Sequence, residues 1–406
     1  MVLYMVLSKK ATDVKGSSTL QITAKTKAMK LSGIDIVSFT AGEPDFKTPH
    51  NINKAAIDAI NAGFTKYTES AGILKLREAI CEKLEKDNGL FYAPNQIVVS
   101  NGAKHAIFNA LSVLLNPSDE VIIFAPYWLS YPEMIKMADG VPVIVQTTEE
   151  NKYIPTAEQI KNAITNKTKI MIINSPCNPS GAVYSIEDLQ MIEKLAVEHD
   201  LYVISDEIYE KLIYDKDAFH ISIAHLSEEM TSRTIIVNGV SKAFSMTGWR
   251  IGYTASNRKI AACIDNIQSH LTSSPNSIAQ VAALEGIKNS KEYVEAMRQE
   301  FSKRRDYMYD RLSKMPLVKA FRPVGAFYTF VDISDLCGKT LNGVEINDAL
   351  GFTDVLLTKS NVAVVPCADF GAPNHIRLSF CLSMESIERG LDRLEALLKG
   401  NSLFIL

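Results

Sequence analysis

The sequence predicts an α/β fold in which helices cover a mostly parallel sheet, followed by a smaller α+β domain. Two observations support the large domain: short β-rich runs alternate with helical stretches between about residues 90 and 255, and each run is nearly continuous in apolar residues. Strands that are buried on both faces have this composition, and they are typical of parallel sheets. A third observation, a change of pattern after about residue 290, supports the second domain.

Five strands are expected in the large domain, and they are separated by helices. Ser185 and Asp188 have the spacing of a capping box, and apolar residues then recur every three to four positions, which predicts one of these helices. After about residue 290 the pattern predicts a charged helix at 291–314, a strand at 326–330 and a last helix at 386–399. The five strands are predicted at residues 97–100, 121–124, 170–173, 202–205 and 234–237.

A chain of 406 residues is too long for one ordinary core, so two domains are expected. We expect a large ligand-binding domain at 46–290 and a small C-terminal domain at 291–406. The N-terminal segment, 1–45, is too short to fold alone. It is therefore expected to pack on the small domain or across a subunit interface.

Composition and charge exclude several classes of protein. Apolar residues make up 47% of the chain and charged residues 22%, with a formal net charge of -3, as in ordinary globular proteins. Charges of both signs are interspersed, so nothing favours nucleic-acid or membrane binding. No apolar run approaches the ~20 residues of a spanning helix, and the short apolar start lacks the features of a signal peptide. We therefore expect a soluble, cytoplasmic protein whose partners are small molecules and other copies of itself.

The cysteines give no sign of a metal site. The six lie far apart and form no CxxC pair, which argues against a zinc site or a disulfide framework and suits a reducing cytoplasm. We therefore predict no bound metal.

Polar residues follow the predicted strands at the edge where open α/β sheets bind ligands. Asn101-Gly102-Ala103-Lys104 follows the first strand and opens a helix, whose free backbone NH groups suit a phosphate. Trp128 follows the second strand, and Asn178 lies in a polar turn after the third. Each has an ordinary structural alternative: a helix start, rim packing or a turn.

The fourth and fifth strands end in residues with more specific chemistry. Asp206 ends the fourth strand, and a buried carboxylate there requires a cationic partner or several donors; a protonated pyridine nitrogen is such a partner. Ser241 and Lys242 follow the fifth strand, and Arg250 comes eight residues after Lys242.

Ser241-Lys242 followed by Gly248-Trp249-Arg250-Ile251-Gly252-Tyr253 closely resembles the lysine motif of class I aminotransferases, which depend on pyridoxal 5′-phosphate (PLP) and have PLP fold type I. The resemblance covers roughly residues 15 to 400 and is strongest to the bacterial aspartate aminotransferase subgroup. Further blocks occur in that family's order: Ala41-Gly42-Glu43-Pro44-Asp45-Phe46, Thr65-Lys66-Tyr67, Ala71-Gly72, Pro126-Tyr127-Trp128, Asn178-Pro179-Ser180-Gly181, Ser205-Asp206-Glu207-Ile208-Tyr209 and Ile376-Arg377-Leu378-Ser379.

The resemblance implies PLP as the cofactor and a role for each matching residue. Lys242 would form the Schiff base with the cofactor and move the proton as general acid and base. Asp206 would face the ring nitrogen and keep it protonated. Tyr209 and Asn178 would bond the phenolic oxygen, and Trp128 would stack on the ring.

The same resemblance implies how the phosphate is held. The backbone NH groups of Ala103 and Lys104 would bind it together with Ser241, Arg250 and Tyr67. In the family the residue that matches Tyr67 comes from the other subunit, so a homodimer with shared active sites is implied.

Substrate recognition is implied in the same way. Arg377 would clamp the α-carboxylate, because a guanidinium offers two parallel donors, with the Gly42 backbone, Asn178 and Trp128 nearby. In the subgroup a lysine at the position of Lys104 and hydroxyls of a segment like Ser17-Ser18-Thr19 contact the distal carboxylate. We therefore expect transfer of the amino group of L-aspartate to 2-oxoglutarate. The alternative that Lys104 only covers the phosphate stays open.

Other functions remain open at this stage. Prephenate, or aromatic and other amino acids, are alternative substrates. A PLP-dependent lyase or synthase is possible on the same scaffold, and a non-catalytic module is a third class. The presence of Lys242, Asp206 and Arg377 together argues against the non-catalytic module, because it needs none of them.

Overall fold

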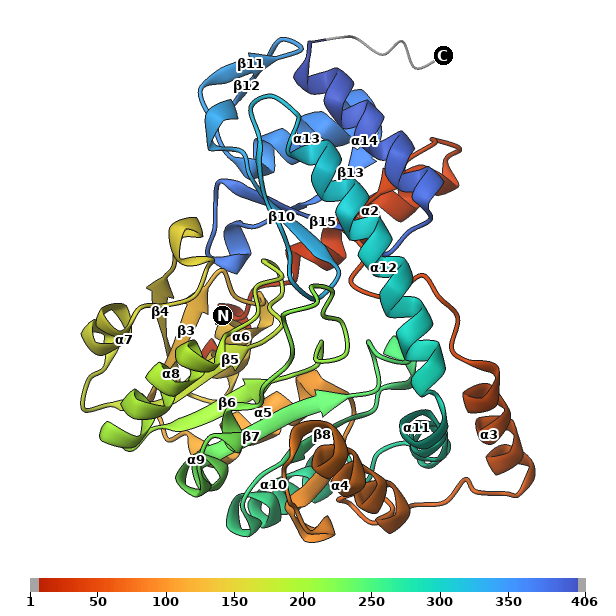
Figure 1. Ribbon diagram of the computed structural model, residues 1–406, viewed down its shortest axis with the longest axis vertical. Helices are drawn as coiled ribbons and strands as arrows, with labels where there is room; N and C mark the ends of the chain where they lie inside the picture. Colours follow the sequence, from red (N-terminus) through yellow and green to blue (C-terminus); the bar gives the residue numbers. More distant parts are fainter. Residues whose placement is uncertain (1–6, 401–406) are drawn as a thin grey trace, which may run out of the picture.

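The computed structural model describes residues 7–400 and contains two main sheets, each covered by helices (Figure 1). The larger sheet has seven strands in the order β2-β8-β7-β6-β5-β3-β4. Within it β8 runs antiparallel to both of its neighbours, and the strands from β7 to β4 are mutually parallel. The strands are β2 (Ile97–Ser100), β3 (Glu120–Ala125), β4 (Val141–Gln146), β5 (Thr168–Asn174), β6 (Tyr202–Asp206), β7 (Thr234–Gly239) and β8 (Gly252–Ala255).

Both faces of this sheet are buried by helices, as the nearly continuous apolar strands require. Along β3, Val121 and Ile123 pack toward one face, whereas Ile122 and Phe124 pack toward the other. Helices α5 (Ala103–Leu114), α6 (Ser130–Met137) and α10 (Arg258–Leu271) cover the first face. The second face is covered by α7 (Ala157–Ala163), α8 (Ile186–Glu198) and α9 (Glu228–Arg233), and by α3 (His50–Asn61), α4 (Leu74–Asn88) and α11 (Ser277–Asn289).

The smaller sheet is antiparallel and has the order β14-β15-β10-β9. Its core contains Phe327, Phe352 and Phe380, all fully buried. The long helix α12 runs from the large sheet's helices to this small domain (Figure 1). The elements are α12 (Lys291–Leu312), β9 (Lys319–Phe321), β10 (Tyr328–Asp332), β11 (Lys339–Leu341), β12 (Val344–Ile346), α13 (Ala349–Ser360), β13 (Val362–Ala363), β14 (Val365–Pro366), β15 (His375–Ser379) and α14 (Met384–Leu398).

The strand expected at 326–330 begins two residues later than predicted. Ala326 has a φ of 60°, in the left-handed region, which is incompatible with an extended strand, so β10 starts at Tyr328. The expected helix after Ser185 is confirmed: Ser185 accepts a bond from the Asp188 backbone, and the Asp188 carboxylate accepts one from the Ser185 backbone.

The N-terminal segment contacts both parts of the molecule. Strand β1 (Val37–Ser38) pairs in parallel with β13 of the small domain. Helix α2 (Ser18–Leu31) is joined to α13 by an ion pair between Lys25 and Asp354. Helix α1 (Lys9–Asp13) lies instead against the large domain, where Lys10 pairs with Asp139. The domain limits at residues 45 and 290 stay a prediction.

Between residues 7 and 400, no helix is both long and apolar enough to cross a membrane. All six cysteines are free thiols.

Candidate active site

A cavity of about 300 Å³ lies at the carboxyl ends of the parallel strands, between the large sheet and the small domain. This is where ligands bind in open α/β sheets. Eleven of the twelve residues that the sequence singled out line it: Gly42, Ala103, Lys104, Trp128, Asn178, Asp206, Tyr209, Ser241, Lys242, Arg250 and Arg377. Tyr67 does not line it and is 88% exposed.

One end of the cavity is a cradle for an anion. Helix α5 begins there after Gly102, whose φ is 89°, so the free NH groups of Ala103 and Lys104 are available at the positive end of the helix. The Arg250 guanidinium lies beside them and donates to the carbonyl oxygens of Thr247, at 2.8 Å, and Asn101, at 3.4 Å. This concentration of donors and positive charge fits a phosphate group.

Asp206 ends β6 and is 3% exposed. Its Oδ2 accepts a hydrogen bond from the Tyr131 hydroxyl at 2.7 Å, and its Oδ1 accepts one from the Ile208 backbone at 3.3 Å. Burial raises the pKa of this carboxyl to about 6, although the Tyr131 and Ile208 hydrogen bonds oppose the rise. A protonated ring nitrogen placed against Asp206 would supply the charge that this buried carboxylate lacks.

Lys242 follows β7 and projects into the same cavity. Its Nζ donates to the carbonyl oxygen of Gly42 at 2.6 Å. Burial lowers the pKa of the ammonium to about 8, because the charged form loses its hydration. A lysine amine of this kind gives up its proton readily near neutral pH and can then act as a nucleophile and a base.

Arg377 of β15 forms the opposite wall and is 2% exposed. Its Nη1 donates to Asn178 Oδ1 at 2.9 Å and its Nη2 to the Thr40 carbonyl at 3.3 Å, while the guanidinium lies over the Tyr328 ring, 4.2 Å from the centroid. Within residues 7–400 its Nε has no hydrogen-bond partner and no carboxylate pairs with it. A buried cation without a counter-charge is costly, so this site fits an anionic ligand.

Lys104 is a further basic residue of the cavity. Lys104 Nζ is 4.8 Å from the centre of the Trp128 ring, and burial, followed by the charge of Arg250, lowers the pKa of this lysine. Ser17 and Thr19 line the cavity with it, and the buried Thr19 hydroxyl has no hydrogen-bond partner in the described part of the chain.

Sequence reasoning missed two tyrosines at the site. Tyr131, on α6, bonds Asp206, and Tyr328, on β10, lies under Arg377 with its hydroxyl 3.0 Å from that of Tyr209. Tyr131 is 75 residues from Asp206 in the sequence, and Tyr328 is 119 residues from Tyr209, so no local pattern marks these two tyrosines. The one available signal was a polar aromatic residue inside an apolar run, as at Tyr328.

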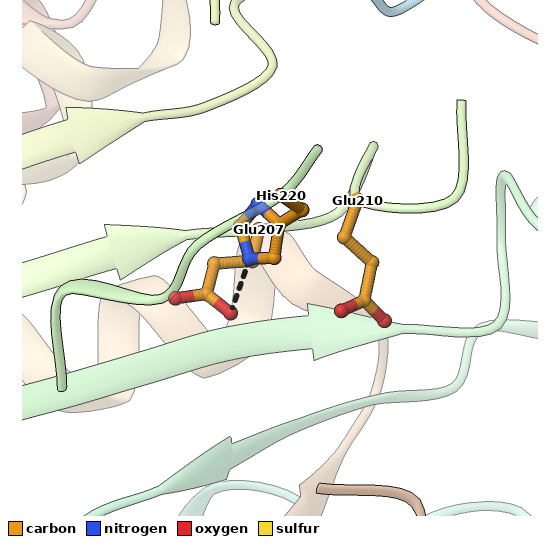
Figure 2. Close-up of side chains that lie close together, drawn as sticks. All are labelled: Glu207, Glu210 and His220. Carbon is orange, nitrogen blue, oxygen red and sulfur yellow. Dashed lines mark ion pairs between the residues drawn. The ribbon is translucent and has the colours of Figure 1, made fainter. Parts of the chain in front are cut away.

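A buried charged cluster lies next to the site but does not line its cavity. Figure 2 shows Glu207, Glu210 and His220, whose ligand atoms lie within 4.8 Å of one another. His220 Nε2 is 3.0 Å from Glu207 Oε2. On the other side, Lys83 pairs with Glu210.

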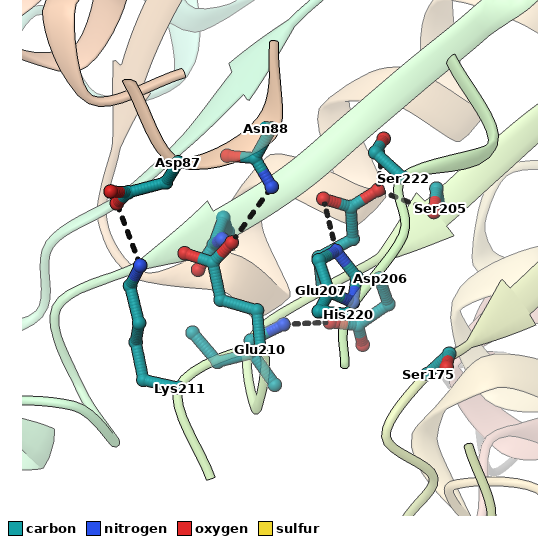
Figure 3. Close-up of polar contacts among 12 residues, drawn as sticks. Asp87, Asn88, Ser175, Ser205, Asp206, Glu207, Glu210, Lys211, His220 and Ser222 are labelled. Atoms are coloured by element: carbon teal, nitrogen blue, oxygen red, sulfur yellow. Dashed lines mark hydrogen bonds and ion pairs between the residues drawn. The ribbon is translucent and has the colours of Figure 1, made fainter. Parts of the chain in front are cut away.

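Figure 3 shows the wider network of hydrogen bonds and ion pairs around this cluster. Hydroxyls of Ser205 and Ser222 donate to Glu207 Oε1 at 2.9 and 2.6 Å. Burial would raise the pKa of Glu210, but the charges of Lys83, Lys211 and His220 and the hydrogen bond from Lys83 together outweigh it and hold the pKa well below the usual range. Since Lys83 already occupies the Glu210 carboxylate, we interpret the cluster as a structural ion-pair network.

Comparisons with known proteins agree with this geometry. The family model described as aminotransferase class I and II matches residues 34–394. An aspartate aminotransferase of Bacillus sp. (strain YM-2) is 49% identical, with 97% of this chain and 99% of the relative covered. An aspartate/prephenate aminotransferase of Thermus thermophilus is 42% identical, with coverage of 95% and 97%. The solved structure of an aspartate aminotransferase from Thermus thermophilus with maleate has a TM-score of 0.91 and 41% identity, with coverage of 97% and 100%.

Proposed function

This chain belongs to the aminotransferase class I and II family, and from that premise we propose that it transfers the amino group of L-aspartate to 2-oxoglutarate with PLP as cofactor. The observation that carries the choice of substrate is that the cavity holds two cations, Arg377 and Lys104, in addition to the Arg250 and Lys242 side chains assigned to the cofactor. A dicarboxylic amino acid presents one carboxylate to each. The names of the similar aspartate aminotransferases support the same choice.

The residues of the cavity fit the cofactor. The NH groups of Ala103 and Lys104 would hold its phosphate with Ser241 and Arg250, and Asp206 would face its ring nitrogen. The Trp128 indole would stack on the ring, and Asn178 and Tyr209 would donate to the phenolic oxygen. When bound, PLP supplies an aldehyde that combines with amines and a protonated ring that accepts the electrons left at the substrate Cα.

Lys242 performs the covalent and proton-transfer chemistry in this proposal. Its Nζ, as the free amine, would hold the cofactor through the aldehyde group, and it would become a free base when a substrate amine takes its place. That free amine would then take the proton from the substrate Cα as general base and give it up again as general acid. A pKa near 8 suits both roles, since an appreciable fraction of the amine is unprotonated near neutral pH.

Arg377 and Lys104 orient the substrate for that transfer. Arg377 binds the α-carboxylate through parallel NH donors, with Asn178 and the Gly42 backbone beside it. Lys104 binds the distal carboxylate together with the hydroxyl of Thr19, which is buried and lacks another partner among the described residues. Holding both ends fixes the Cα–H bond relative to the lysine amine.

A homodimer with shared sites is part of the proposal. Tyr67 is 88% exposed and lies outside its own chain's cavity, so it is free to reach the phosphate end of the site in a second copy. We place the protein in the cytoplasm, a location that its six free thiols suit.

A panel of half-reactions tests the function. The protein is loaded with PLP and mixed with aspartate, glutamate, phenylalanine or alanine while the cofactor absorbance is followed. We expect the largest rate with aspartate, and reversal of the absorbance change by 2-oxoglutarate. Prephenate is added as a second acceptor, because one similar protein is named for both activities. An absorbance change that no oxo acid reverses, with release of ammonia, would indicate a lyase instead.

A further inference from the structure

Tyr131 contacts two of the groups proposed to hold the cofactor ring. It lies in the first turn of α6 and is 2% exposed. Its hydroxyl donates to Asp206 Oδ2 at 2.7 Å. Its ring meets the Trp128 indole edge to face, with centroids 5.4 Å apart and an interplanar angle of 89°. Its own backbone NH also donates to the Trp128 carbonyl at 2.9 Å.

The surroundings of Asp206 make this hydroxyl important. The only other hydrogen bond to the carboxylate from the described residues is the longer one from the Ile208 backbone. The remaining titratable groups that face it come from three segments: Cys177 after β5, Glu207 and Tyr209 after β6, and Lys242 after β7. Glu207 opposes the negative charge of Asp206, and Lys242 favours it. Tyr131 is therefore the strongest single donor to a carboxylate that is otherwise desolvated.

We propose that Tyr131 is a positioning residue for the amino-transfer reaction: its hydroxyl keeps the Asp206 carboxylate ionised and directed at the cofactor ring nitrogen, and its ring fixes the Trp128 indole. The inference rests on the proposed function, because it requires that Asp206 and Trp128 hold a pyridine ring. Tyr131 touches neither cofactor nor substrate in this scheme and acts through those two residues.

The consequence is a defined dependence on pH. Burial raises the pKa of the Tyr131 hydroxyl well above its usual value, so the hydroxyl keeps its proton and stays a donor. Asp206, with a pKa near 6, loses its charge as the pH falls through that value. Removing the donor raises the pKa of Asp206 further. The affinity for a protonated ring nitrogen then declines at a higher pH than in the wild type.

The test compares two ligands on two proteins. Tyr131→Phe removes one oxygen and keeps the ring that packs on Trp128. The dissociation constant of the cofactor-free protein is measured for PLP and for the analogue in which CH replaces the ring nitrogen. We expect Tyr131→Phe to raise the dissociation constant for PLP by about 10- to 100-fold, the usual effect of losing a hydrogen bond to a charged group. The dissociation constant for the analogue should change by less than about twofold, since the analogue presents no nitrogen to Asp206.

A pH series adds a readout that simple loss of packing would not produce. The pH at which PLP affinity falls by half on the acid side should rise by about one unit in Tyr131→Phe. Tyr92→Phe is the matched control. Tyr92 is also buried, at 8% exposed, it does not line the cavity, and its hydroxyl has no hydrogen-bond partner in the described structure. The Tyr92→Phe variant should therefore leave the affinities for both ligands and the pH profile unchanged.

A second variant covers the case in which Tyr131→Phe fails to fold. Asp206→Asn removes the carboxylate that would be left without its donor, so Tyr131→Phe is also made in that background. There it should change PLP affinity by less than about threefold, and a larger further loss would overturn the inference.

Equal weakening of PLP and of the analogue by Tyr131→Phe, or wild-type affinity with an unchanged pH profile, would also overturn it. A wild-type protein that binds no PLP would overturn the proposed function and this inference together.

Discussion

At the scale of single residues, burial shifts two pKa values of the site in opposite directions. It lowers the pKa of Lys242 to about 8 and raises that of Asp206 to about 6, because desolvation penalises the charged form of each. The two residues contribute differently as a result. Lys242 can lose its proton near neutral pH, whereas Asp206 needs its donors to stay ionised there. Pairs of groups separated in this way are typical of acid–base sites.

The first prediction concerns Lys242. Lys242→Ala should still bind PLP, since the phosphate cradle at α5 is untouched, but it should lose transamination. Borohydride should fix the cofactor to the wild-type protein and not to this variant. Peptide mass spectrometry of the reduced protein checks the position. Lys54→Ala, at an exposed lysine that pairs only with Asp58 among the described residues, is the control and should label normally. A label on any other lysine of the wild type would contradict the assignment.

The second prediction concerns substrate choice at Lys104. Lys104→Ala should lower kcat/KM for aspartate. The loss should correspond to roughly 1.5–3 kcal/mol of transition-state binding, the contribution of a charge-assisted hydrogen bond. Activity toward alanine, which has no distal carboxylate, should barely change. The comparison of two substrates cancels any damage to the nearby phosphate cradle, because that damage would slow both alike. Equal losses would mean that Lys104 serves only the cofactor.

At the scale of elements, strong local patterns were predictable and weak ones were not. The five predicted strands occur as β2, β3, β5, β6 and β7, with ends within two residues of those expected. The missed strand β4 is the edge of the sheet: its apolar run contains Pro142, which cannot donate to a strand ladder, and Val141 and Ile144 are about half exposed. Strand β8 is only four residues long, Gly-Tyr-Thr-Ala, and is buried by pairing with β2 and β7. Neighbouring strands, not local propensity, decide such segments.

The approach of β8 to helix α5 gives the third prediction. A Cβ on Gly252 would lie 2.3 Å from the Ala103 backbone nitrogen, so Gly252→Ala should displace the start of α5 and its NH donors. We expect weaker binding of PLP, and also of inorganic phosphate, by at least tenfold. Gly248→Ala is the matched control in the same motif, because its Cβ would meet nothing within 4 Å. Isothermal titration measures both ligands, and equal affinities in the two variants would contradict this account.

At the scale of the whole molecule, the site exists only because distant segments meet. Eleven of the residues predicted from the sequence line one cavity. They were predicted from the family resemblance and from the rule that ligands bind beyond the carboxyl ends of parallel strands. The sequence could not place Tyr131, Tyr328 or the Thr40 carbonyl, because their roles depend on contacts across 75 to 337 residues of chain. Physical patterns along a sequence report on neighbours in the chain. The Tyr131 contact is set instead by the packing of α6 on the large sheet, and the other two by how the small domain and the N-terminal segment close over that sheet.

The last prediction tests whether the assembly extends to a second chain. Lys242→Ala and Tyr67→Ala homodimers should each be weakly active or inactive at limiting PLP. In a mixed dimer with shared sites, one site would carry both changes and the other neither. Random reassociation makes about half of the dimers mixed, each with one intact site of two, so activity should recover to about a quarter of the wild-type value. If Tyr67 instead served its own chain, every site would carry one change, and mixing would give no more than the average of the parents. The exposed position of Tyr67, outside its own cavity, favours recovery.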